Sequence, residues 1–381
     1  MKILLLSSNI SNEAGGYSES SFILRENLDK IIENETFLFG FWTSKLLNLN
    51  FKLSDRINIF SNYFFKSFPF SITYLKKIIS FKPDIIDIQG LWNSAIFFNC
   101  IYYFKTSTPY IITPRGMLQS YSLKKSFFKK ILFFIVLGRY SFNNCSCIRA
   151  TSLIEAKTIR NLFKKKNIVV VPNAVKIPKL KLTYKEHRKK KKFRLLFLSR
   201  IHKKKGIVEL LHSWKSLENK YLDWELLICG FDSKHKLEMI NLASDLKLKN
   251  VLWQGYKMGK DKERFYLSGD LFILPSYSEN FGLVVAEALA HGLPVITTNN
   301  TPWTILNKNK CGWCIGLSIK KLVQTLSYAM ELSSKERFLM GQRGRKLVLE
   351  NFSSSSVAEK MQKVYKWILK KGPKPSELIF N

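Results

Sequence analysis

The stretch PSYSENFGLVVAEALAHGLPVI, residues 275–296, determines the fold predicted for this chain. An apolar run at 271–274 precedes it and indicates a buried strand, and residues 294–297 indicate the next strand. Between them, residues 283–290 are rich in helix formers, and Gly292 stops the helix. The pattern therefore predicts a strand–loop–helix–strand unit, the building block of α/β sheets.

The loop of this unit carries features of a site for an anion and a sugar. Ligands of open α/β sheets bind beyond the carboxyl ends of the strands, where Glu279 stands. The backbone N–H groups of Phe281, Gly282 and Leu283 open the helix, and a helix N-terminus favours a phosphate. Gly282 adds no side chain where a ligand approaches. A carboxylate beside a phosphate suits sugar hydroxyls, and Glu287, about two helical turns later, is placed for a second hydroxyl pair.

This stretch resembles the Glu-x7-Glu signature of the retaining, nucleotide-sugar-dependent glycosyltransferases of family 4. The resemblance rests on a Pro-Ser turn, on Glu279 followed by Asn-Phe-Gly, and on Glu287 before Gly-x-Pro-Val-Ile. It implies the GT-B fold, an α/β architecture of two Rossmann-like, doubly wound domains that face each other across a cleft. The alternative is an ordinary strand–helix–strand unit whose glutamates face water.

A second loop, between a predicted strand and a predicted helix, is rich in cations. Arg200 and Lys205 stand five residues apart there, and such a pair can clamp two phosphate oxygens. The loop resembles the Gly-Arg-x4-Lys-Gly donor loop of the family, with Ser199 in place of the first glycine. The alternatives are a solvated basic turn and an assignment to Lys204 in place of Lys205.

The resemblance implies a role for each site residue. Arg200 and Lys205 stabilise the leaving diphosphate and Glu279 orients the donor sugar, so these three form the predicted catalytic set, while Glu287 orients the ribose. The predicted donor-binding residues are Gly15, Gly16, Arg200, Lys205, Tyr256, Glu279, Asn280, Phe281, Gly282, Leu283 and Glu287. No nucleophile and no cofactor are implied. We expect no essential metal, because the donor site lacks the Asp-x-Asp of metal-dependent glycosyltransferases.

Three features of the first half bear on the site. A strand, the pair Gly15-Gly16 and a helix indicate a phosphate or substrate loop, or else a tight turn, and the family carries a similar pair near the donor phosphates. Where the family often has His-x-His, this chain has Asp87 and Gln89, so no role is carried over from those histidines. Arg115 lies in a Pro-Arg-Gly-Met turn that some members place on the acceptor side, and it is either an anion contact or a structural partner of a carboxylate.

Length and composition suggest how the chain is divided. A chain of 381 residues is long enough for two or three domains. The resemblance then implies an acceptor-binding Rossmann-like domain at 1–175 and a donor-binding Rossmann-like domain at 193–352, with a basic linker at 176–192. It also implies that a helix within residues 353–381 crosses back onto the first domain, as the final helix of the GT-B fold does.

The charge is strongly basic, with 62 Lys and Arg against 28 Asp and Glu and a net charge of +34. Such an excess calls for an anionic partner: nucleic acid, an anionic membrane or a phosphorylated substrate. Residues 121–139 alternate lysine pairs with aromatic and aliphatic residues, which indicates a basic amphipathic helix or, alternatively, a core helix with solvated lysines.

The same region predicts a membrane-facing surface on the first domain. No acidic residue occurs between Asp87 and Glu155, whereas the basic residues of that interval are Lys105, Arg115, Lys124, Lys125, Lys129, Lys130, Arg139 and Arg149. Apolar insertion is expected from Phe127, Phe128, Ile131 and Phe134.

The cysteines and the N-terminus indicate a reducing compartment. The apolar opening at 1–6 turns polar at Ser7, so we expect a first strand and no signal peptide. Free thiols are then expected, with a zinc site built from Cys145, Cys147, Cys311 and Cys314 as the alternative. No apolar stretch reaches the roughly 20 residues that span a bilayer. We expect a cytoplasmic protein, peripheral on the inner face of the plasma membrane.

These observations predict a retaining glycosyltransferase that makes a bacterial surface polysaccharide: lipopolysaccharide, capsule or exopolysaccharide. Its expected partners are a nucleotide-sugar donor, a glycan or lipid-linked acceptor and an anionic membrane, but not nucleic acid. One alternative is a nucleotide-sugar epimerase of the same fold. The other is a basic nucleic-acid-binding protein, against which the intact donor motifs and the lack of a binding-module signature argue.

Overall fold

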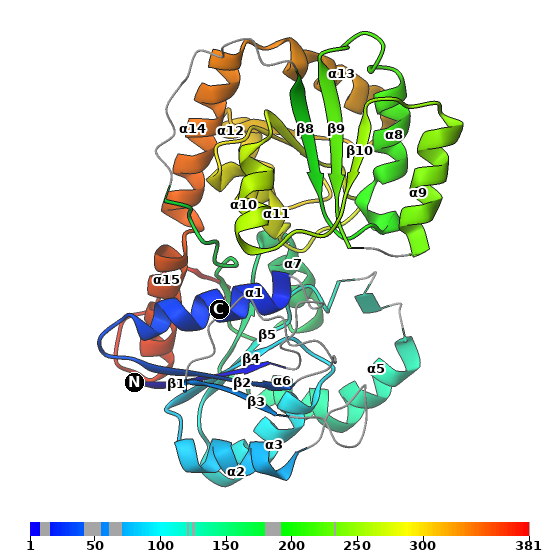
Figure 1. Cartoon of the computed structure of the whole chain (residues 1–381). Helices are drawn as coiled ribbons and strands as arrows, with labels where there is room; N and C mark the ends of the chain where they lie inside the picture. The colour runs from blue at the N-terminus through cyan, green and yellow to red at the C-terminus, as the bar shows by residue number, and fades with distance from the viewer. Residues whose placement is uncertain are drawn as a thin grey trace. The chain divides into compact units, whose positions relative to one another are not determined.

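The chain folds into two compact units, here described from a computed structural model (Figure 1). The described residues are 1–7, 16–41, 55–60, 71–119, 122–123, 126–179, 192–231 and 234–380. Unit 1 comprises Met1–Ala174 and Ser354–Asn381, and unit 2 comprises Val175–Ser353. Gly15, Lys124, Lys125 and residues 180–191 of the expected linker lie outside the described residues.

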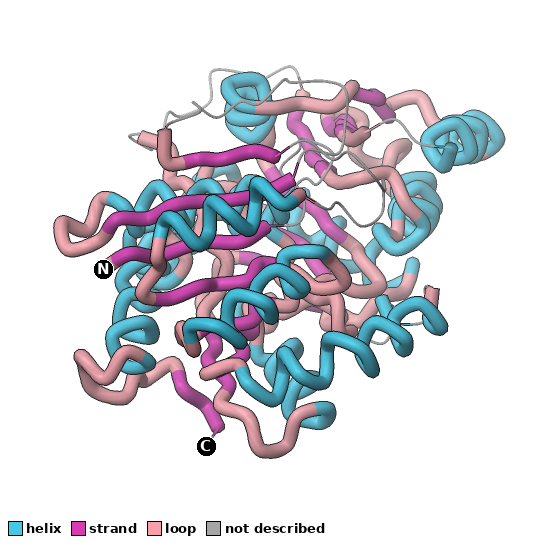
Figure 2. The backbone as a smooth tube through the Cα atoms, turned by 90° about the horizontal axis from the view of Figure 1, so that it is seen from below, coloured by secondary structure: helices cyan, strands magenta, loops and turns pink. Residues whose placement is uncertain are grey.

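Unit 1 is built on a sheet whose strand order is β14-β7-β6-β5-β4-β1-β2-β3 in the described chain. Its strands are β1 (Lys2–Ser7), β2 (Glu35–Phe41), β3 (Ile57–Phe60), β4 (Ile85–Gln89), β5 (Tyr110–Thr113), β6 (Cys147–Ala150), β7 (Ile168–Val170) and β14 (Leu378–Phe380). All neighbours are parallel except β14, which pairs antiparallel with β7. Figure 2 shows these strands running side by side. Parallel strands are buried on both faces, which explains why β1 is apolar from Ile3 to Leu6 and why every residue of β4 is buried.

Helices cover both faces of this sheet. They are α1 (Gly16–Asp29), α2 (Ile72–Phe81), α3 (Ser94–Thr106), α5 (Phe127–Phe133), the π-helical η2 (Phe134–Gly138), α6 (Arg139–Asn144), α7 (Leu153–Leu162) and α15 (Ser354–Ile368). Successive residues of a strand point to opposite faces. Accordingly, Leu4 packs in one buried cluster with Tyr74 of α2, and Leu5 packs in another with Met361 of α15.

The C-terminal helix α15 is held to unit 1 by buried hydrogen bonds. The Tyr365 hydroxyl donates to Oδ2 of Asp87 at 2.8 Å, and Thr113 donates to Oδ1 of the same carboxylate at 2.9 Å. The Asn34 amide donates to Gln362 at 2.7 Å. Asp87 therefore serves as a buried acceptor for the returning helix.

Unit 2 has a wholly parallel sheet with the order β10-β9-β8-β11-β12-β13. Its strands are β8 (Phe193–Leu198), β9 (Trp224–Cys229), β10 (Val251–Gln254), β11 (Leu271–Leu274), β12 (Val295–Thr298) and β13 (Gly312–Ile315). The chain builds outward from β8 through β9 to β10 and then returns to place β11 on the other side of β8. This reversal makes a topological switch point, at which ligands of open α/β sheets bind.

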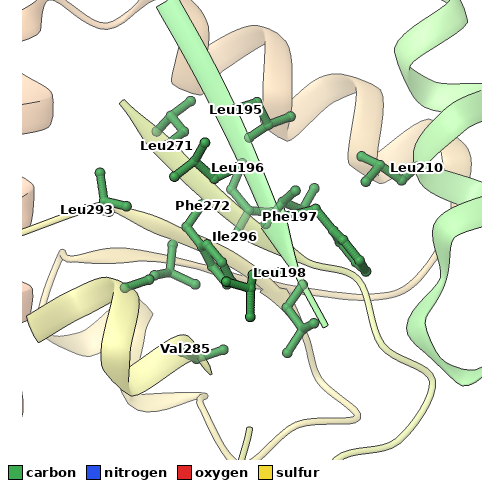
Figure 3. Packing of buried hydrophobic residues seen from close by; sticks show 14 of the residues in the cluster. Leu195, Leu196, Phe197, Leu198, Leu210, Leu271, Phe272, Val285, Leu293 and Ile296 are labelled. Atoms are coloured by element: carbon green, nitrogen blue, oxygen red, sulfur yellow. The ribbon is translucent and has the colours of Figure 1, made fainter. Parts of the chain in front are cut away.

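The helices of unit 2 enclose an apolar core. They are the 3₁₀ turn η3 (Lys203–Lys205), α8 (Ile207–Lys215), α9 (Lys234–Asp245), α10 (Gly259–Leu267), α11 (Leu283–Ala290), α12 (Ile305–Lys308), α13 (Ile319–Glu331) and α14 (Ser334–Asn351). Leu196, Phe272 and Ile296 pack together from three neighbouring strands (Figure 3). The predicted α/β fold with parallel sheets is thus confirmed for both units.

Two further expectations concern thiols and membrane spans. All six cysteines are free and buried, and burial raises the pKa of Cys145 to about 12. The described residues contain no group of three or more His, Cys, Asp or Glu side chains that could hold a metal ion, so the zinc alternative has no support. Among the described helices, none combines the length and the apolar character that crossing a bilayer requires.

Candidate active site

Two loops meet at the switch point of unit 2. One follows β8 and carries Arg200 and Lys205, and the other follows β11 and carries Glu279 and Gly282. Because β8 and β11 are parallel neighbours, their carboxyl ends lie at the same edge of the sheet. The sheet order therefore brings together residues that the sequence separates by a whole set of helices and strands.

The Lys205 ammonium forms an ion pair with Oε1 of Glu279 across these loops. Ser276 donates a second hydrogen bond to the same oxygen at 2.9 Å. The Glu279 backbone N–H donates to the carbonyl of Asn300 at 3.1 Å, which fixes the loop itself. The two charged side chains retain exposed fractions of 16% and 13%, so the pair is largely buried yet open to a ligand.

Gly206 permits the close approach of the two loops. Its φ is +65°, a left-handed conformation that glycine adopts without strain. A Cβ atom at this position would lie only 2.0 Å from the backbone oxygen of Pro275. The Tyr277 N–H also donates to the Lys204 carbonyl at 2.8 Å, so backbone contacts join the loops directly. This explains why a glycine follows Lys205.

Positive charge is concentrated in the loop after β8. Burial lowers the pKa of the Lys204 ammonium, Glu279 opposes this shift, and Lys205 and Arg200 add to it. Burial also lowers the pKa of His202, and neighbouring cations reinforce the shift. Arg200 is exposed at the start of the loop. The loop thus places several cationic side chains close together, and a bound anion would reduce the repulsion between them.

Helix α11 begins beside this pair. Gly282 is its N-cap with a φ of +75°, and Trp303 Nε1 donates to the Phe281 carbonyl. The Phe281 ring is buried between Trp303 and Phe352, at centroid distances of 5.5 and 5.8 Å. The Phe281 side chain therefore supports the loop, while the N–H groups of the first turn, from Leu283 onward, form the helix N-terminus.

Glu287 lies about one turn along α11 and contacts α10. Its Oε2 accepts from the Tyr266 hydroxyl at 2.7 Å, and its Oε1 pairs with Lys262 at 2.5 Å. His291, one turn later, stacks on the Tyr266 ring at a centroid distance of 4.8 Å. Sequence reasoning missed Lys262 and Tyr266, although their spacing of four residues places them on one face of α10.

Tyr256, which follows β10, forms an aromatic platform. The residue is 40% exposed, and its ring stacks on Phe231 with a centroid distance of 3.4 Å and an interplanar angle of 21°. Phe231 was not predicted, and only its position just after Gly230 at the end of the neighbouring strand could have indicated it. The described loops therefore place cations, a carboxylate, a helix N-terminus and a flat aromatic surface at the carboxyl edge of one sheet.

The site residues predicted in unit 1 have different surroundings. Gly16 is the exposed first residue of α1. Arg115 has a φ of +52° and donates to Gln89 and Asn173 at 2.8 Å and to Ser21 at 3.3 Å. Amide and hydroxyl oxygens, and not the carboxylate that the structural alternative predicted, accept these hydrogen bonds.

Comparison with known proteins identifies the family of the second unit. Residues 178–347 match the family "Glycosyl transferases group 1". An uncharacterized glycosyltransferase of Haemophilus influenzae is 29% identical over 58% of this chain and 62% of its own length. The capsular polysaccharide biosynthesis glycosyltransferase CapM of Staphylococcus aureus is 30% identical over 46% of each chain. The chain thus spans less than two thirds of the length of these relatives.

Solved structures share the whole fold. Sucrose-phosphate synthase from Thermosynechococcus elongatus superposes with a TM-score of 0.76 at 16% identity, covering 97% of this chain and 100% of that one. Anabaena Alr3699/HepE, solved with UDP and glucose, gives 0.75 at 15% identity, covering 96% and 100%. The predicted resemblance is therefore confirmed: the chain has the GT-B fold, and residues 178–347 of its second unit match the group 1 glycosyl transferases.

Proposed function

We propose that this chain is a retaining glycosyltransferase that moves a sugar from a nucleotide-sugar donor to an acceptor hydroxyl. The observation that carries the proposal is the Lys205–Glu279 pair, held beside Arg200 and the N-terminus of α11 at the switch point of unit 2. Cations suit the oxygens of a diphosphate, and a carboxylate beside them suits the hydroxyls of a sugar. The UDP and glucose in the structure of Anabaena Alr3699/HepE support the same class of donor.

The cations act on the leaving group. When the bond between sugar and diphosphate breaks, negative charge develops on the phosphate oxygens. Arg200, Lys205 and the first turn of α11 stabilise that charge, and their fixed positions avoid the cost of reorganisation during the reaction. The Ser276 and Glu279 contacts hold Lys205 in place before the donor arrives.

The Glu279 carboxylate acts on the sugar. Within the part of the chain that the structure describes, both side-chain hydrogen bonds to it reach Oε1, so Oε2 remains for a sugar hydroxyl. A carboxylate that is oriented by two donors positions the anomeric carbon against the acceptor. Glu287, held by Lys262 and Tyr266, is proposed to serve the ribose, and the Tyr256–Phe231 stack the nucleobase.

The product is proposed to be a surface polysaccharide built on a glycan or lipid-linked acceptor. Support comes from the similarity to CapM, a glycosyltransferase of capsular polysaccharide biosynthesis. We also propose that no divalent ion is essential, since Arg200 and Lys205 supply the charge that a metal would otherwise bring to the diphosphate.

A ligand screen followed by a product assay tests the proposal. Binding to the native state raises the unfolding temperature by mass action, so UDP-, GDP-, ADP- and dTDP-sugars are compared by thermal shift. The stabilising donor is then incubated with candidate acceptors, and NMR reads the anomeric configuration of the product. Stabilisation by one donor and a retained configuration are expected. No stabilisation by any nucleotide sugar, an inverted product, or an epimerised donor without transfer would overturn the proposal.

A further inference from the structure

The helical segment α5–η2–α6 of unit 1 is apolar on two opposite sides. On its inner side, the Phe134 ring lies 6.2 Å, centroid to centroid, from the rings of both Phe142 and Phe163. Those two rings stack on each other at 4.2 Å. Phe133 meets Trp92 edge-on at 5.6 Å. These contacts attach the segment to the core of unit 1 and account for one side only.

The opposite side, here called the outer face, consists of apolar side chains that are open to solvent. The exposed fractions are 84% for Phe128, 65% for Leu132, 66% for Ile135 and 64% for Val136, and Phe127 and Ile131 add 52% and 40%. The spacing of three and four residues places most of these side chains in one stripe along the helix. An uncovered stripe of this kind marks an interaction surface rather than an ordinary solvent face.

The structure corrects the predicted membrane surface in three positions. Phe134 belongs to the inner side, because its ring packs against the core. Arg149 is only 1% exposed and donates to the Val171 and Pro172 carbonyls. Arg115 is engaged within the unit, as described above. The surface therefore depends on Leu132, Ile135 and Val136, which the sequence did not single out.

The charge beside the outer face has one sign. Lys129, which follows Phe128, and Arg139, which lies just beyond Val136, are both exposed. No acidic residue occurs in the sequence between Asp87 and Glu155, an interval that contains the whole segment. Apolar side chains flanked by cations match a bilayer with anionic headgroups, whereas a protein partner of this face would need an acidic rim around an apolar groove.

We propose that the outer face docks unit 1 on the surface of a bilayer that contains anionic lipid. The helix lies in the interface with Phe128, Leu132, Ile135 and Val136 among the acyl chains. Lys129 and Arg139 stay at the headgroups, where each cation raises partitioning roughly fivefold.

The docked helix is connected to the carboxyl edge of the sheet in unit 1. Trp92 follows β4 at that edge with a φ of +59°, and its ring contacts both Phe133 and the Lys130 ammonium, which lies 5.7 Å from the ring centroid. On the proposed function, this edge belongs to the domain of the acceptor. Docking would then bring a lipid-linked acceptor close to the loop that holds Trp92.

Vesicle flotation of the full chain tests the docking. The probe is phosphatidylcholine vesicles with a rising fraction of phosphatidylglycerol, and no sugar donor is present. Flotation is expected to rise with phosphatidylglycerol and to fall with salt. The variant Phe128→Glu/Leu132→Glu/Ile135→Glu is expected to lose binding by roughly tenfold or more, because it removes apolar burial and adds repelling charge.

A matched control replaces three exposed apolar residues of unit 2 with Glu. Leu222, Leu237 and Leu349 of unit 2 are also more than half exposed, and their triple change to Glu is expected to leave flotation intact. Thermal melting of both variants checks that they fold.

Absence of flotation in the folded wild-type chain, or equal flotation of the outer-face variant, would overturn the proposal. A dimer that the outer-face variant abolishes, without vesicle binding, would assign the face to a second copy and overturn it as well. Because no donor is used, each of these outcomes leaves the proposed transfer reaction to its own test.

Discussion

The two sheets use the polar residues at and near their carboxyl edges in different ways. In unit 1, Asp87 is wholly buried and bound by Tyr365 and Thr113, and Arg115 is bound by several amides and hydroxyls. In unit 2, Lys205 and Glu279 also bind each other, but both remain partly exposed, and Arg200 beside them is exposed. The comparison teaches that similar sheets can devote the same edge to internal structure or to a ligand, depending on how completely the charged groups are buried and satisfied.

The largest expected effect follows from removing the carboxylate at the unit 2 edge. Glu279→Gln keeps the shape but weakens the hold on the sugar, so turnover should fall by roughly a hundredfold or more. Affinity for the nucleoside diphosphate should change little. The control is Glu225→Gln, since Glu225 pairs with Arg194 at the amino end of the same sheet. Turnover that survives in Glu279→Gln would contradict the assignment.

The cations of the same edge should act on affinity. Arg200→Ala and Lys205→Ala each remove a charged hydrogen bond, which costs about 1.5–3 kcal/mol, or roughly tenfold or more in binding. Calorimetry with the bare nucleoside diphosphate measures this loss. Arg194→Ala, at the opposite end of β8, serves as the control and should bind normally. If Arg200→Ala and Lys205→Ala both bind the diphosphate like the wild type, the unit 2 edge does not serve a ligand in the way proposed.

Substitutions near the carboxyl edge of the unit 1 sheet should lower the free energy of unfolding and leave the affinity for nucleotide unchanged. Tyr365→Phe removes the buried donor to Asp87 and should lower the free energy of unfolding by about 1–3 kcal/mol. Nucleotide affinity should remain unchanged. Denaturant titration measures the first quantity and calorimetry the second, with Tyr328→Phe, an exposed tyrosine of α13, as the control. A stable Tyr365→Phe variant with impaired donor binding would reverse the roles given to the two edges.

The smallest expected effect is that of metal removal. Because Arg200 and Lys205 supply positive charge to the diphosphate, turnover in EDTA should equal turnover in added Mg²⁺. Steady-state rates at matched ionic strength provide the comparison. A strict requirement for the ion would show that the cations at the unit 2 edge are insufficient.

Local patterns along the chain were enough to predict much of the fold. The helix expected at 283–290 is α11, and the helix expected within residues 353–381 is α15, from Ser354 to Ile368. Strand and helix periodicity arise from the backbone geometry of a few neighbouring residues, so they can be read without knowledge of distant contacts. The motifs around Arg200 and Glu279 could be recognised for the same reason, because each consists of residues that are close in the sequence.

The sequence by itself determined the two α/β units, the loops that end their strands and the residue types in those loops. Only the tertiary structure decided which of these residues meet. Lys205 and Glu279 are 74 residues apart and pair because β11 returns to lie beside β8. In the same way, the rotation of the segment after α5 decided that Phe134 faces the core while Ile135 faces solvent. Spacing within a chain specifies the face and the end of an element, whereas the order of strands and the packing of helices depend on contacts between distant segments.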